Sequence, residues 1–217
     1  MLSLAPPPPE EGIAGPVAGW AELLVNGLTF DCLGLAPSTP IDPVKPRNVL
    51  ILTPDELEQS EAIALMPGPH LAAAGNAMPV LRAMAKLASD LGRALGNVSA
   101  FAWGPAHFIV GPDIFHRLVK TWCEGGPFPA LFFVGVVDTD QGEIRSEGLA
   151  FLTGQEIALA PSLGLARFEG AQLIARLVDE LVGCEPIGQP VEIQGENGDL
   201  LLLEPVDGGA VIRVRKR

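Results

Sequence analysis

Apolar residues recur along the chain with a helical period in three places, and these segments set the predicted fold. From Pro79 to Leu95 they recur every three or four positions, which places them on one face of a helix. The same spacing follows Gly111-Pro112 until Gly125-Gly126, and it appears again from 168 to 182, where Gly183 provides a stop. These segments predict three amphipathic helices.

Shorter apolar runs between them predict β-strands. Asn26-Gly27 lies between two such runs and predicts a hairpin of two antiparallel strands. The run from Ala130 to Val137 is too short for a helix this apolar and is rich in aromatic and β-branched residues, which favours a buried strand at the centre of a sheet. Further strands are predicted over residues 48–52, 97–103, 147–152, 155–159, 191–194, 200–203 and 210–214.

The order of these elements predicts an α+β fold with a mixed, largely antiparallel sheet packed against about three to four amphipathic helices. A fourth, short helix is expected from Thr53 to about Ala64, because Thr53-Pro54 is typical of a helix start. Residues 1–18, with Pro6 to Pro9, predict a mobile proline-rich arm, with a proline-recognition ligand as the alternative. Residues 19–217 are then expected to form a single domain.

Composition narrows the range of partners. The chain is 48% hydrophobic and carries a net charge of −12, which predicts a compact globule that repels nucleic acid and anionic membrane surfaces. Basic residues cluster only in Arg213-Val-Arg-Lys-Arg217, which reads either as an electrostatic anchor or, more simply, as a solvated strand end. The start of the sequence shows no targeting signal, and prolines interrupt the longest uncharged run, so cytoplasm is the expected location.

Candidate chemistry is sparse. No phosphate-binding glycine motif and no metal-ligand spacing occurs, so we expect neither a cofactor nor a metal ion. Trp103 and His107 flank a turn after a predicted strand, where sites often lie, and Glu156 is an acid in an apolar strand. Each has a structural alternative: Trp103 would cap the core, His107 would satisfy a loop carbonyl, and Glu156 would face solvent.

Four short motifs occur in an order that resembles the bacterial domain-of-unknown-function family 4261 over roughly residues 80–182. They are Leu91-Gly-Arg-Ala-Leu, Ala102-Trp103-Gly104-Pro-Ala106, Pro112-Asp113-x-Phe115, and Glu147-Gly148-Leu149-x-Phe151-x-x-Gly154-x-Glu156-Ile157. The chain departs from the family pattern at Ala158, where a further acid is expected, and after Gly183. The resemblance implies a fold neighbourhood and a bacterial origin, and it implies no reaction.

These observations predict a non-catalytic, cytoplasmic interaction or regulatory domain that self-associates, with a homodimer as the expected oligomer. The second hypothesis is an enzyme or small-ligand-binding protein whose pocket lies near Trp103, His107 and Glu156. A structure in which these side chains line one concave pocket would favour the second hypothesis.

Overall fold

The computed structural model describes residues 2–4, 20–36, 41–50, 60–195 and 198–217. The chain divides into two compact units, Met1–Phe132 and Phe133–Arg217, where the sequence predicted one domain after a terminal arm. Each unit combines a β-sheet with helices, so the predicted α+β class is confirmed.

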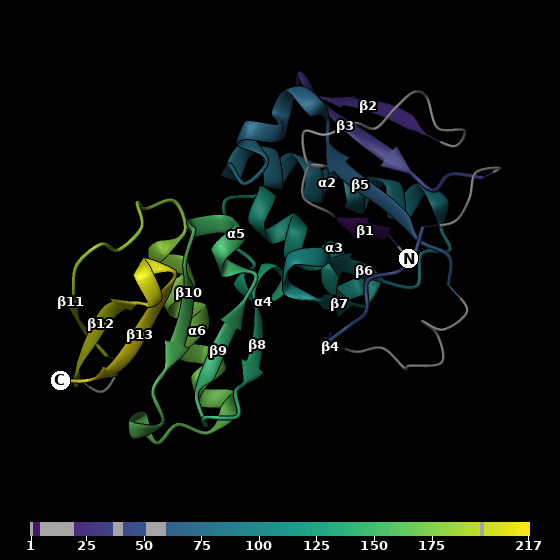
Figure 1. Ribbon diagram of the computed structural model, residues 1–217. Coiled ribbons are helices and arrows are strands. Elements are labelled where there is room, and N and C mark those ends of the chain that lie inside the picture. Colours follow the sequence, from purple (N-terminus) through teal and green to yellow (C-terminus); the bar gives the residue numbers. More distant parts are fainter. Residues whose placement is uncertain (1, 5–19, 37–40, 51–59, 196–197) are drawn as a thin grey trace. The chain divides into compact units, whose positions relative to one another are not determined.

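The first unit is built on a seven-stranded mixed sheet with the order β2-β3-β5-β1-β6-β7-β4 (Figure 1). β1 pairs in parallel with both β5 and β6, so part of the predicted mobile arm instead forms a central strand. Residues 5–18 of that arm lie outside the described residues. The strands are β1 (Leu2–Leu4), β2 (Ala21–Val25), β3 (Leu28–Leu33), β4 (Asn48–Leu50), β5 (Ile63–Pro67), β6 (Phe101–Trp103) and β7 (Phe108–Val110).

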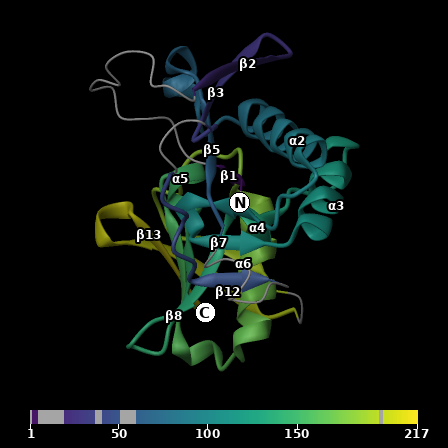
Figure 2. The ribbon, with the colours of Figure 1, turned by 90° about the vertical axis from the view of Figure 1, so that its right-hand side faces the viewer.

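Two of the predicted helices are confirmed in the first unit: α2 (Met78–Leu95) and α3 (Pro112–Cys123). Both begin with a proline in the first turn, which the sequence suggested for α3, and Gly96 ends α2 in the left-handed conformation, with φ 70°. α2 packs against β1, β3 and β5, and it also contacts α3 (Figure 2). The two helices thereby bury the apolar faces that their periodicity predicted.

An aromatic cluster connects the sheet to these helices. The rings of Phe101 and Phe115 stack with centroids 3.9 Å apart, and His116 meets Phe101 edge-on at 5.2 Å. Gly92 of α2 permits this packing, because a Cβ at that position would lie 2.4 Å from Cζ of Phe101. Ser89 Oγ lies 2.8 Å from Nδ1 of His116, within hydrogen-bonding distance. Ser89 and His116 therefore form a polar pair that packs against the aromatic rings.

The apolar run from Ala130 to Val137 is buried, but it is not one strand. Its first half forms the short helix α4 (Ala130–Phe133), and its second half enters β8 (Gly135–Asp138). The predicted eight-residue strand is therefore wrong over its first four residues, while the burial of Phe132 and Phe133 is confirmed at 1% and 0% exposure. A continuous apolar run carries no periodicity that separates a buried helix from a buried strand, and Pro129, whose carbonyl accepts the amide of Phe132, favours a turn.

The second unit has a six-stranded sheet with the order β11-β12-β13-β10-β9-β8 (Figure 1). β10 and β13 are parallel and the other neighbours are antiparallel. The third predicted helix, α6, packs against β9, where Gly170 approaches Ile144. The remaining elements are β9 (Ile144–Glu147), α5 (Leu149–Thr153), β10 (Glu156–Leu159), α6 (Arg167–Leu181), β11 (Val191–Gln194), β12 (Leu200–Val206) and β13 (Val211–Lys216).

Three further boundaries differ from the prediction. Most of the strand expected over 147–152 is the helix α5, which lies between two glycines in the left-handed conformation, Gly148 with φ 92° and Gly154 with φ 82°. Residues 63 and 64, expected at the end of a helix, begin β5, while residues 51–59 lie outside the described residues. The strand expected from residue 97 starts only at Phe101. The predicted hairpin around Asn26-Gly27 is confirmed, with φ 52° and 79° at its two turn residues.

Candidate functional site

Trp103 and His107 lie at the two ends of one turn in the first unit. Trp103 is the last residue of β6 and is fully buried, in agreement with a core role. His107 is half-buried in a left-handed conformation with φ 46°, and its carbonyl accepts the backbone amides of Arg47 and Asn48 at 2.9 and 3.2 Å. The hydrogen bond expected from the His107 ring to a loop carbonyl is not made by Nδ1, which is buried and has no hydrogen-bond partner among the described residues. The backbone carbonyl of His107 instead anchors the start of β4.

Glu156 lies in the second unit, and its carboxylate supports a helix end. Oε1 accepts the backbone amides of Gly148 and Ala150 at 2.9 and 3.0 Å, and Oε2 accepts the hydroxyl of Ser146. Burial raises the pKa of this carboxyl above its ordinary value, and the hydrogen bonds from Ser146 and the backbone oppose that shift. The solvent-facing alternative is wrong here, because the side chain caps the amide groups that begin α5.

The structure therefore brings Trp103 and His107 to one turn and gives Glu156 a separate capping role in the other unit. A shared pocket of the three residues stays a prediction. The pocket described in the second unit is lined by other residues, which the sequence patterns did not single out because their side chains meet only through tertiary packing.

The basic C-terminal strand carries an acidic partner for each of its charges. Arg213 pairs with Glu143 at 3.5 Å, Arg215 with Glu204 at 3.2 Å, Lys216 with Asp199 at 3.1 Å, and Arg217 with Glu192 at 3.1 Å. These cations belong to β13 and the residue after it, and their partners lie in β11, in β12 and in the residues just before β9 and β12. The reading as a strand end is thus supported, since the local positive charge is compensated within the sheet.

β2 forms one end of the first sheet and presents apolar side chains. Leu24 is 70% exposed and Trp20, which precedes the strand on the same alternating face, is 41% exposed. Glu22, between them, is the one charged residue from 20 to 25. No strand among the described residues pairs with the outer edge of β2, so the amide and carbonyl groups that alternate away from β3 face outward.

The two end strands of the second sheet differ from β2, because an arginine of α6 binds a backbone carbonyl of each. Arg176 of α6 donates a hydrogen bond from Nη2 to the carbonyl of Gln194 in β11 at 2.7 Å. Arg167, also of α6, donates from Nη2 to the carbonyl of Val136 in β8 at 2.8 Å. Each outer strand of this sheet therefore has a backbone acceptor occupied by an arginine, which hinders the addition of a further strand. No local sequence signal marks these two arginines as edge caps.

No family model, curated protein or solved structure matches this chain. The resemblance to family 4261 consequently stays a prediction. Across the described part of the chain, no helix combines the length and apolar character needed to cross a membrane. In the same residues, no group of three or more histidine, cysteine or acidic side chains is arranged to hold a metal ion.

Proposed function

We propose that this chain is a non-catalytic interaction domain of a bacterial cytoplasmic protein, and that it self-associates as a dimer through β2. The observation that carries the proposal is the 70% exposure of Leu24 on an end strand of the first sheet. Strand addition at such an edge supplies backbone hydrogen bonds together with the burial of alternating side chains. β4 lies at the opposite end of that sheet, and its described residues are Asn48–Leu50.

A second copy is the occupant that suits the charge of this edge. In an antiparallel pairing about a two-fold axis at Leu23, Glu22 of one copy lies opposite Leu24 of the other, and no like charges face each other. Alternation in a two-residue hairpin directs the backbone groups of Glu22 and Leu24 outward, so this register also matches donors with acceptors. The absence of directly opposed like charges in this register matters for two chains that each carry a net charge of −12.

The non-catalytic half of the proposal is supported by the roles of the candidate polar groups. The carboxylate of Glu156 is engaged by two backbone amides and a hydroxyl, and these contacts hold α5. His116 and Ser89 form a pair packed against aromatic rings, and Ser89 is only 2% exposed. In both arrangements, the polar groups that acid–base chemistry would need are engaged in structural contacts.

Size-exclusion chromatography with light scattering tests the proposal on the full chain. The wild-type protein is expected to be dimeric, and Leu24→Glu is expected to be monomeric, because it places a carboxylate in the centre of the shared edge. Phe168→Glu is the matched control, since Phe168 is 73% exposed on α6 and lies outside the proposed interface. A wild-type monomer at high concentration overturns the proposal, and so does a dimer that Phe168→Glu breaks and Leu24→Glu leaves intact.

The register has its own test. In a Cys184→Ser background, which removes the exposed native thiol, Leu23→Cys is expected to form a disulfide-linked dimer under mild oxidation. Directly opposed residues in a non-hydrogen-bonded antiparallel pair lie close enough for such a bond. Efficient cross-linking at Val25→Cys with none at Leu23→Cys would contradict this register.

A further inference from the structure

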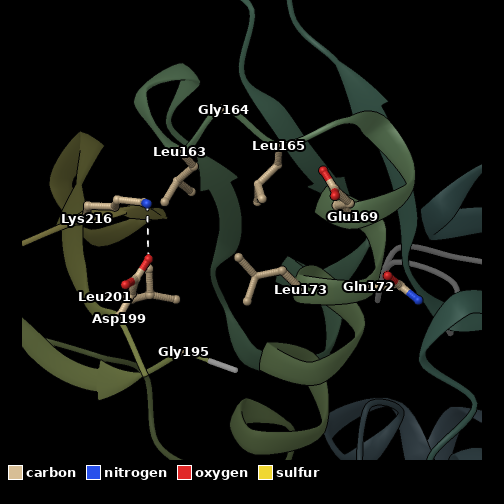
Figure 3. Close-up of a pocket in the computed structure, with 10 residues that line it drawn as sticks. All are labelled: Leu163, Gly164, Leu165, Glu169, Gln172, Leu173, Gly195, Asp199, Leu201 and Lys216. Carbon is tan, nitrogen blue, oxygen red and sulfur yellow. Dashed lines mark ion pairs between the residues drawn. The ribbon is translucent and has the colours of Figure 1, made fainter. Parts of the chain in front are cut away.

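The second unit contains a cavity of about 400 Å³ beside the first turns of α6. Its walls come from the loop that follows β10, from α6 and from the β12–β13 ribbon (Figure 3). A volume of this size lies within the range of pockets that hold small organic ligands. The three predicted site residues do not line it.

Apolar side chains form the middle of this pocket. Leu163 and Leu165 come from the loop, Leu173 from α6 and Leu201 from β12. Figure 3 shows the side chains of Leu165 and Leu173 directed toward the space between them. Leu163 and Leu201 are 9% and 5% exposed, so they belong to the core of the unit and give the pocket a fixed wall. An apolar ligand body would remove this surface from water.

Charged groups lie on two sides of the leucines, and the described lining residues carry a formal charge of −1. On one side Lys216 Nζ pairs with Asp199 Oδ2 at 3.1 Å, which compensates both charges (Figure 3). On the other side, Glu169 accepts the backbone amide of Ala166 at Oε2, at 2.8 Å. Within the described part of the chain, no lysine or arginine forms an ion pair with Glu169. Glu169 is exposed in the first turn of α6 and has no cationic side-chain partner there, so its carboxylate favours a cation at this end of the pocket.

We infer that this pocket binds a small organic cation, a primary amine whose branched apolar body lies against the leucines and whose ammonium group lies beside Glu169. The inference is independent of the dimer through β2, because every residue it uses belongs to the second unit. A carboxylate ligand is disfavoured by Asp199 and Glu169, and Lys216, the cation among the described lining residues, already has a partner.

The test uses the full-length ¹⁵N-labelled protein and three probes of similar shape and different charge: 3-methylbutylamine, leucine and 4-methylpentanoate. Titration of 3-methylbutylamine at millimolar concentration is expected to shift the amide resonances of Gly164, Leu165 and Leu201, with weaker binding of leucine and the weakest of the anion. Tighter binding of the anion overturns the inference, as does the absence of shifts at these amides with the amine.

Glu169→Gln is the decisive variant because glutamine keeps the helix cap and removes only the charge. The affinity for 3-methylbutylamine is expected to fall about tenfold, in line with the loss of one charge-assisted contact. Glu180→Gln is the matched control: Glu180 lies on the same helix, outside the pocket, and pairs with Arg176 at 3.1 Å. Equal amine binding by wild type and Glu169→Gln contradicts the proposed place of the ammonium group.

Leu173→Ala tests the apolar wall separately. Loss of this side chain is expected to weaken binding of all three probes by a similar factor, since each carries the same branched body. The amide spectrum of each variant away from the pocket reports whether the fold is kept. Selective loss of amine binding in Leu173→Ala would contradict the assignment of Leu173 to the ligand's apolar body.

Discussion

The side chain of Gln155 pairs with the backbone of Ile187 in both directions. Nε2 donates to the carbonyl of Ile187 at 3.0 Å, and the amide of Ile187 donates to Oε1 at 2.7 Å. The same Nε2 donates to the carbonyl of Gly209 at 2.6 Å. Gln155 is only 3% exposed, so this primary amide connects the start of β10 to two segments that follow α6 and β12 in the chain.

Gln155→Ala is expected to lower the free energy of unfolding by about 1 to 3 kcal/mol, because it leaves the half-buried backbone groups of Ile187 and Gly209 without this partner. Urea denaturation at neutral pH measures this change. Gln172→Ala, at an exposed glutamine of α6, is the control and is expected to stay within about 0.5 kcal/mol of wild type. Similar losses for the two variants would contradict the bridging role of Gln155.

Glu156→Ala is expected to cost about 2 to 4 kcal/mol of stability, because the amides of Gly148 and Ala150 and the hydroxyl of Ser146 lose their common acceptor. Glu156→Gln retains one oxygen for the two amides and is expected to cost about 1 kcal/mol. Chemical denaturation of both variants distinguishes a Glu156 carboxylate that caps α5 from one that adds nothing to stability. If the alanine variant were as stable as wild type, the capping of α5 by Glu156 would be refuted.

His116 provides a pH dependence whose sign follows from its surroundings. Burial lowers its pKa from the ordinary value of 6.5, Arg93 adds to the shift, and Asp113 and Asp90 oppose it. The unfolded chain therefore binds the proton more tightly than the folded chain. The contribution of His116 to stability is fully present above the unfolded pKa and is lost as the pH falls through the lower folded value.

His116→Gln is accordingly expected to flatten the pH dependence of stability between about pH 8 and pH 5. Denaturation midpoints of wild type and variant across this range give the comparison, and the difference between the two curves isolates the histidine from other titrating groups. Ser89→Ala, which removes the hydroxyl beside Nδ1, serves as the second variant and is expected to keep the direction of the pH dependence. Parallel curves for wild type and His116→Gln would show that the pKa of His116 is the same in both states.

Phe133→Ala is expected to cost about 3 to 5 kcal/mol, because it removes a fully buried ring and leaves a cavity. The loss of stability expected at Phe133 is the same in a helix as in a strand, since it depends on the burial of the ring. Leu131→Ala is the neighbouring control, because Leu131 is 51% exposed on the same short helix. A loss below about 1 kcal/mol at Phe133 would contradict its burial.

Local sequence patterns determined those parts of the fold whose signal is contained within a few turns or one hairpin. α2, α3 and α6 follow the three- and four-residue spacing of apolar positions, and Asn26-Gly27 defines its hairpin through two left-handed residues. Each of these elements is favoured by neighbours close in sequence, so composition and spacing are enough to locate it.

Tertiary structure decided the features that depend on residues far apart in the chain. Leu2–Leu4 enters the centre of the first sheet because β5 and β6, some sixty and a hundred residues later, supply its hydrogen-bonding partners. Ala130–Val137 is divided between a helix and a strand because uniform apolarity predicts burial without selecting a backbone conformation. The capping by Glu156 and the pocket of leucines likewise exist only where folding brings separated side chains within contact distance.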